Sequence, residues 1–101
     1  METDFIILSE YCRETHIEPS FVVLLEEEGL IDTCVEQGIQ YIAISQLPSL
    51  ERYTRLYYEL SINVEGIGAV SHLLEKIGDM QSEIRQLRSR LRSFQVEIRE
   101  E

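Results

Sequence analysis

The 101-residue sequence predicts a mainly α-helical fold, in which a small helix-turn-helix domain with a β wing precedes one long helix. Two short helical segments separated by about four residues indicate the helix-turn-helix. A glycine-containing turn between two apolar stretches indicates the wing. An uninterrupted apolar repeat in the last third of the chain indicates the long helix. We therefore expect two domains, residues 1–62 and residues 63–101.

The first domain begins with a brief strand at residues 5–8, "FIIL", which two short helices follow. Ser9 is a suitable N-cap for the first helix. Pro19 suits the first turn of the second helix, which we expect over residues 20–28 with Gly29 as its C′ residue. Two short helices joined in this way are typical of a helix-turn-helix.

The wing and a third helix complete the first domain. The stretches "IDTCVE" and "IQYIAI" flank a turn at Gln37–Gly38 and predict a small hairpin. Ser45 is a candidate N-cap for the third helix, and Pro48 would lie in its first turn. We expect this helix to continue to about Leu60.

The long helix begins after Asn63, a good N-cap residue, with Ile62 and Ile67 at the positions of a hydrophobic staple. Apolar residues then alternate at spacings of three and four, which are the a and d positions of a coiled coil. This apolar stripe consists of Val70, Leu73, Ile77, Met80, Ile84, Leu87, Leu91, Phe94 and Ile98. The helix would extend over about 43 Å, too far for the first domain to cover. We therefore expect the stripe to be the interface of a homodimer.

The charges beside the stripe leave the orientation of the two helices open. Glu83 and Arg88 occupy g and e positions and have the spacing of an attractive pair between parallel helices. Antiparallel helices centred near Ile84 would instead place the acidic residues 75–83 opposite the arginines of residues 85–92. We favour the antiparallel arrangement.

Net charge is distributed unevenly along the chain. The total is −10, and residues 1–50 contain ten acidic residues and a single basic residue, Arg13. No lysine or arginine occurs between Glu14 and Glu51. Such an acidic surface repels DNA and anionic membranes and favours basic protein partners. We therefore expect neither direct DNA binding nor membrane association. Because the N-terminal residues are acidic where a secretory signal would be basic, we expect a cytoplasmic protein.

The cysteines and histidines do not form a catalytic or metal-binding pattern. Cys12 and Cys34 are isolated in the sequence, so we expect two buried thiols and no metal site. We place His16 in the turn of the helix-turn-helix and His72 at an exposed c position of the long helix. No nucleophile–base–acid pattern or phosphate-binding glycine loop surrounds either histidine. The sequence predicts no enzymatic activity and no cofactor.

Three blocks of the sequence carry a resemblance to a known family. They are "EYCRETHI" (10–17), "LLEEEGLI" (24–31) and "LYYELSINVEGIGAVSHLLEKIGDMQSEIRQLRSRL" (56–91). Together they resemble the MerR-type winged-helix architecture, and more closely the CbpM chaperone-modulator branch of that group. The resemblance implies a MerR-like winged helix-turn-helix with a small β wing, followed by a long C-terminal dimerisation helix.

The resemblance also implies a function. Proteins of the CbpM family bind the J-domain of a DnaJ-like co-chaperone of the CbpA type. By resemblance, this chain would occupy that J-domain and inhibit its stimulation of Hsp70 by occlusion. The alternative is a MerR-type DNA-binding transcriptional regulator, which presents arginine or lysine to phosphates. The absence of such residues from the second helix and wing favours the protein partner.

Tyrosines of the third helix are a second feature that could contact a partner. Arg52 and Arg55 flank three tyrosines, Tyr53, Tyr57 and Tyr58. Aromatic side chains beside arginines can stack on nucleic-acid bases. Tyr53 and Tyr57 share one helical face with leucines, which favours core packing. We expect Tyr58 to be the exposed tyrosine.

The most unusual local charges are the three carboxylates of Glu26–Glu28. They lie in the last helical turn, at the negative end of the helix dipole, which is unfavourable unless compensated. A locally unfavourable feature often marks a functional surface, whereas the alternatives are a solvated face or pairing with Arg52 and Arg55. The candidate partner-binding residues are Glu26, Glu27, Glu28, Asp32, Glu36 and Tyr58.

Overall fold

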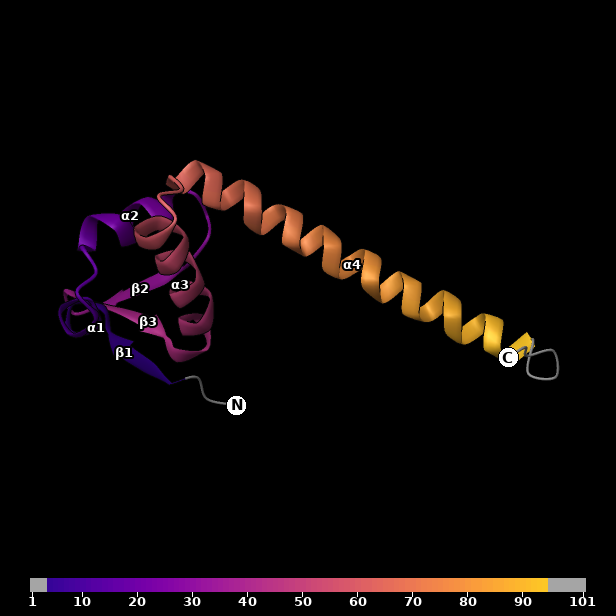
Figure 1. The fold of residues 1–101 in the computed structure, drawn as a ribbon. Coiled ribbons are helices and arrows are strands. Elements are labelled where there is room, and N and C mark those ends of the chain that lie inside the picture. Colours follow the sequence, from indigo (N-terminus) through magenta and orange to yellow (C-terminus); the bar gives the residue numbers. More distant parts are fainter. Residues whose placement is uncertain (1–3, 95–101) are drawn as a thin grey trace. The chain divides into compact units, whose positions relative to one another are not determined.

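The computed structural model describes residues 4–94, and Figure 1 shows its fold. In chain order, the elements are β1 (Phe5–Ile7), α1 (Leu8–Thr15), α2 (Pro19–Glu27), β2 (Thr33–Glu36), β3 (Ile39–Ala43), the 3₁₀ helix η1 (Ile44–Gln46), α3 (Leu47–Thr54), the π-helix η2 (Arg55–Glu59) and α4 (Val64–Phe94). The predicted mainly α-helical fold, with a small wing and a long C-terminal helix, is confirmed.

The chain divides into two compact units, residues 1–68 and residues 69–101. The boundary lies inside α4 rather than at residue 62. The reason is that Val64 and Ile67, in the first turns of α4, are buried in the core of the first unit. The start of the long helix is therefore part of the small domain.

Helices α1 and α2 form the helix-turn-helix of the first unit. Helix α1 starts at Leu8, directly after β1, so the predicted N-cap role of Ser9 is wrong. Its C-cap residue is His16, which adopts the left-handed conformation with φ 61° and lies in the turn, as predicted. Pro19 opens α2 at its first helical position, where the missing N–H costs nothing.

The end of α2 is a Schellman motif. Gly29 has a φ of 77°, a conformation that costs glycine little. Its N–H donates to the carbonyl of Glu26 at 2.9 Å, and the N–H of Leu30 donates to the carbonyl of Leu25 at 2.9 Å. These bonds satisfy two carbonyls that the helix end would otherwise leave unpaired. The predicted role of Gly29 is confirmed.

The three strands form an antiparallel sheet in the order β1-β3-β2. The β2–β3 hairpin is the predicted wing, and its two-residue turn at Gln37–Gly38 has positive φ at both positions, 53° and 79°. Such turns match the twist of the flanking strands. The sequence left β1 without a partner, whereas the structure pairs it with β3, so that Ile6 lies opposite Ile42.

The buried core of the first unit contains apolar side chains from α1, α2, α3, the start of α4 and the sheet. Its buried members are Leu8, Cys12, Ile17, Phe21, Val22, Leu25, Ile31, Ile42, Leu50, Tyr53, Val64 and Ile67. The expectation of two buried thiols is right for Cys12 and wrong for Cys34. Cys34 is exposed because it lies on the edge strand β2, where only Thr33 is partly buried.

The third helix starts differently from the prediction. The 3₁₀ helix η1 precedes α3, so that Gln46 rather than Ser45 occupies the N-cap position. The Gln46 side chain bonds instead to the main chain of Asp32: its Nε2 donates to the carbonyl at 2.7 Å, and its Oε1 accepts from the N–H at 2.9 Å. These two bonds hold the loop after α2 against η1.

The start of α4 follows the prediction closely. The N–H of Gly66 donates to Oδ1 of Asn63 at 2.8 Å, which confirms Asn63 as the N-cap. Ile67 is fully buried, and Ile62 packs against the same core. A Cβ at position 66 would lie 2.8 Å from Cγ2 of Ile62 and 3.0 Å from Oδ1 of Asn63. A side chain at position 66 would therefore displace Ile62 or Asn63, the staple and the cap.

The second unit contains the rest of α4 and its apolar stripe. Val70 is partly buried, and the following stripe residues from Leu73 to Phe94 are 45% to 77% exposed. The last predicted stripe residue, Ile98, lies outside the described residues. His72 is exposed, as predicted. Among residues 4–94, no helix is both long enough and apolar enough to cross a membrane.

Candidate partner-binding surface

Glu26 has a structural partner within the first unit. Its carboxylate accepts a hydrogen bond from Oγ1 of Thr33 at 2.8 Å, and Oγ1 of Thr33 accepts one from Nε2 of Gln40 at 2.8 Å. This chain of hydrogen bonds joins α2 to both strands of the wing. Glu26 is partly buried and bonds to Thr33 rather than to the arginines considered above. Its unfavourable place at the helix end is thus compensated.

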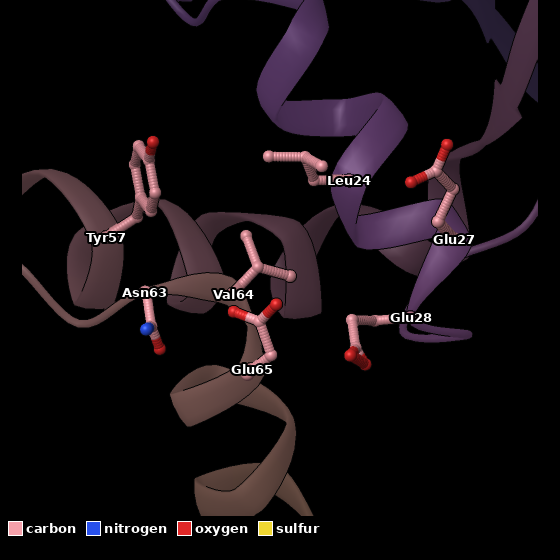
Figure 2. Close-up of a pocket in the computed structure, with 7 residues that line it drawn as sticks. All are labelled: Leu24, Glu27, Glu28, Tyr57, Asn63, Val64 and Glu65. Atoms are coloured by element: carbon pink, nitrogen blue, oxygen red, sulfur yellow. The ribbon is translucent and has the colours of Figure 1, made fainter.

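Glu27 and Glu28 are exposed and line a cavity of about 390 Å³, which Figure 2 shows in close-up. Helix α2 contributes Leu24 and Glu27, its C-cap residue is Glu28, and η2 contributes Tyr57. The remaining lining residues, Asn63, Val64 and Glu65, lie at the start of α4. All of them belong to the first unit. The cavity therefore combines an apolar lining with three carboxylates.

The π-helix η2 places two consecutive tyrosines against one aromatic ring. Tyr57 stacks on Phe21 with ring centroids 4.3 Å apart, and Tyr58 meets Phe21 edge-on at 5.5 Å. A π turn widens the helix locally and is frequent at functional sites. Tyr53 is buried and Tyr57 half-buried, whereas Tyr58 is 44% exposed, so the prediction for the three tyrosines is confirmed.

Tyr58 is held in place at the surface. Its hydroxyl accepts a hydrogen bond from the N–H of Glu18 at 3.2 Å, directly before α2. Tyrosine is enriched at protein interfaces because it adds a large apolar area and a polar tip at little cost in conformational freedom. Its anchored position makes Tyr58 a suitable contact residue.

The two remaining candidates lie elsewhere in the first unit. Asp32 is exposed in the loop between α2 and β2, and Glu36 is exposed at the end of β2, beside the wing turn. Neither lines the cavity, which includes only Glu27 and Glu28 among the six predicted residues. Sequence reasoning missed Glu65, which it had no means to place beside α2.

Burial raises the pKa values of two titratable side chains of α1, Cys12 and Tyr11. Burial raises the pKa of the Cys12 thiol, which keeps it protonated and unreactive. Burial, and secondarily the nearby Glu51 carboxylate, raise the pKa of Tyr11, so its hydroxyl also stays neutral. Within the described part of the chain, no group of three or more histidine, cysteine, aspartate or glutamate residues is arranged to hold a metal ion.

The surface on which a helix-turn-helix protein normally reads DNA is acidic in this chain. The second helix of such a protein enters the major groove, and here that helix is α2. It carries Glu26 and Glu27 and is followed by Glu28, while the stretch from Glu14 to Glu51, wing included, contains no lysine or arginine. This surface lacks the cations that phosphate contacts require.

The fold and this surface can be compared with known proteins. Residues 6–89 match a family model described as MerR HTH family regulatory protein. The chain belongs to this family. The match covers both helices of the helix-turn-helix, the wing and most of α4, and it confirms the predicted MerR-like winged helix-turn-helix. No solved structure matches the chain significantly.

Curated relatives within this group carry one name. The chain is 26% identical over 84 residues to chaperone modulatory protein CbpM from Pseudomonas entomophila (strain L48), a match that covers 82% of this chain and 83% of the relative. It is 29% and 27% identical, with the same coverage, to the proteins of that name from Pseudomonas putida strains W619 and GB-1. These relatives confirm the resemblance to the CbpM family. Their names describe non-enzymatic roles.

Proposed function

We propose that this protein is a chaperone modulator that binds the J-domain of a DnaJ-like co-chaperone of the CbpA type and inhibits its stimulation of Hsp70 by occlusion. The relatives named chaperone modulatory protein support the general role. The specific partner is supported by the acidic second helix: a scaffold of DNA-binding type exposes Glu27 and Glu28 where a DNA reader needs cations. This surface fits a basic protein.

The physical basis of binding is long-range attraction. Residues 1–68 contain 13 acidic residues and three arginines. The J-domain helix that faces Hsp70 is typically rich in lysine and arginine, as the family resemblance implies. Complementary fields of this kind accelerate association and orient the two proteins before contact. A J-domain held through that helix cannot engage Hsp70 at the same time, so binding inhibits the co-chaperone.

The second unit supplies a homodimer in this proposal. The exposed stripe from Leu73 to Phe94 presents apolar side chains at a and d spacing, and a second copy offers the same pattern for knobs-into-holes packing. Antiparallel helices would place the acidic residues 75–83 of one copy opposite the arginines of residues 85–92 in the other. Each dimer would then present two acidic first units.

The decisive experiment combines binding and ATPase measurements. The purified protein is titrated against the isolated J-domain of the DnaJ-like co-chaperone from its own organism, and J-domain-stimulated ATP hydrolysis by Hsp70 is followed in parallel. We expect saturable binding, loss of stimulation, and recovery of stimulation as the Hsp70 concentration rises. The basal ATPase of Hsp70 is the control and stays unchanged. Formation of a ternary complex with full stimulation would exclude occlusion, and absence of binding would exclude the partner.

The DNA-binding alternative has a test of its own. Affinity for duplex DNA depends on counterions that lysine and arginine release from phosphate, and residues 14–51 contain neither residue. The purified protein should therefore leave duplex DNA unretarded at moderate salt in an electrophoretic assay. Saturable, sequence-selective retardation at nanomolar protein would favour a transcriptional regulator over the chaperone modulator.

A further inference from the structure

The cavity between α2, η2 and the start of α4 differs in chemistry from the rest of the acidic surface. Leu24, Val64 and the ring of Tyr57 provide apolar lining, and the carboxylates of Glu27, Glu28 and Glu65 lie around them, as Figure 2 shows. Arginine and lysine bury their aliphatic stems along apolar surface and keep the charged head in a polar environment. The lining therefore matches a long cationic side chain better than a purely apolar or a purely polar ligand.

We infer that this cavity is a recognition pocket for one arginine side chain of the partner protein. The inference rests on the proposed function and names the part of the acidic surface that recognises the J-domain. At about 390 Å³ the cavity lies near the lower end of the range for binding pockets and has room for one long side chain. The partner's helix would lie across the opening of the cavity and insert a single side chain into it.

The three carboxylates are not equivalent in the isolated protein. Glu65 lies in the first turn of α4, where the helix dipole favours negative charge. Glu27 and Glu28 lie at the end of α2, where the dipole opposes it, and Glu26 alone is stabilised there by Thr33. An inserted cation compensates the two carboxylates that the fold leaves in an unfavourable field. Binding of the partner's cation would therefore neutralise carboxylates that are unfavourably placed in the isolated protein.

Arginine suits this cavity better than lysine. Its planar guanidinium can bind carboxylates in a bidentate manner and stack on an aromatic face, whereas the lysine ammonium is a compact, strongly hydrated charge. The ring of Tyr57, which stacks on Phe21 at 4.3 Å, adds an aromatic side chain to the lining of the cavity. The carboxylates come from the C-terminal end of α2 and from the first turn of α4, and they can meet the guanidinium from more than one direction. Replacing the inserted arginine with lysine should therefore weaken binding.

The first test separates the pocket from the general acidic field. A pocket variant combines Glu27→Gln, Glu28→Gln and Glu65→Gln, and a charge-matched control combines Glu10→Gln, Glu14→Gln and Glu59→Gln at exposed positions outside the cavity. Both lose three negative charges and keep similar side-chain volumes. The association and dissociation rates of the J-domain are measured by surface plasmon resonance on the immobilised protein. We expect the pocket variant to dissociate about tenfold faster or more, and the control to change mainly the association rate.

The second test fills the cavity without changing any charge. Leu24→Trp places a large ring in the lining, while Val23→Trp places the same ring at the exposed neighbouring position of α2, outside the cavity. Both positions are partly open to solvent, so both variants should fold, which circular dichroism checks. We expect Leu24→Trp to weaken J-domain binding about tenfold and Val23→Trp to leave it nearly unchanged.

The partner's arginine is identified by a double-mutant cycle. Each arginine of the J-domain's Hsp70-facing helix is replaced in turn by glutamine and by lysine. We expect one Arg→Gln substitution to reproduce the loss seen with the pocket variant and to add no further loss to it. Full additivity for every arginine, or wild-type dissociation of both the pocket variant and Leu24→Trp, would overturn the pocket while leaving the proposed function intact. Failure of the wild-type protein to bind the J-domain would overturn both.

Discussion

The two units of this protein use charge and apolar surface in opposite ways. Residues 1–68 form a buried apolar core of their own and contain 13 acidic residues against three basic ones. Residues 69–101 contain six acidic and six basic residues, and the described part exposes its apolar stripe. The first unit is complete as a fold but unbalanced in charge, and the second is balanced in charge but incomplete as a fold. We propose that each deficit reflects the partner of that unit: a cationic protein for the first and a second apolar helix for the second.

The largest effect should follow from disrupting the stripe. Leu87→Asp combined with Leu91→Asp would bury unpaired charges in the predicted dimer interface, which is severely unfavourable. We expect complete loss of the dimer and fraying of α4, measured by sedimentation and circular dichroism. Ser89→Asp with Ser93→Asp adds the same charges at f and c positions of this helix and should leave the dimer intact. A double Leu variant that sediments as the wild type would refute the predicted interface.

Charge reversal at the end of α2 should have the next largest effect. Glu27→Lys with Glu28→Lys should slow J-domain association about tenfold and flatten its salt dependence, because the attracting field is local to the first unit. Glu26 is left unchanged because it holds the wing through Thr33. Glu75→Lys with Asp79→Lys makes the same change in net charge in the second unit, at f and c positions, and sedimentation checks that this variant remains a dimer. Equal slowing by both variants would show that net charge alone, and not the first unit, directs the encounter.

Alanine substitutions at two glycines of α4 should change the free energy of unfolding in opposite directions. Gly66→Ala would place a Cβ 2.8 Å from the Ile62 side chain, and we expect a loss of about 1–3 kcal/mol in the free energy of unfolding. Gly78 lies in open space, so Gly78→Ala should stabilise the helix by up to about 1 kcal/mol. Urea denaturation of both variants measures the difference. Stabilisation by Gly66→Ala would mean that the cap and staple do not constrain the start of α4.

The smallest effect should come from the hydrogen bonds that connect α2 to the wing. Thr33→Val keeps a β-branched side chain in β2 but removes the hydroxyl that donates to Glu26 and accepts from Gln40. We expect a loss of about 1 kcal/mol in the free energy of unfolding, without loss of the dimer. Thr15→Val, which removes an exposed hydroxyl bonded only within α1, is the control. A Thr33 variant as stable as the wild type would show that Glu26 has no structural role.

Much of the fold could be predicted because its determinants are local in the sequence. The Asn63 cap, the Gly29 helix end, the Gln37–Gly38 turn and the periodic stripe each depend on residues a few positions apart. Such features follow from backbone geometry and helical or strand periodicity alone. The acidic character of the second helix was equally visible, because charge needs no tertiary structure to be counted.

The tertiary structure alone decided which of these residues meet. It paired β1 with β3, left Cys34 exposed on an edge strand, and engaged Glu26 with Thr33. The start of α4 packs within the first unit, so that Glu65 lines the same cavity as Glu27 and Glu28. These outcomes depend on packing between segments far apart in the chain, where the burial of apolar side chains determines which surfaces come together. Local periodicity and helix capping do not specify which distant segments pack against each other.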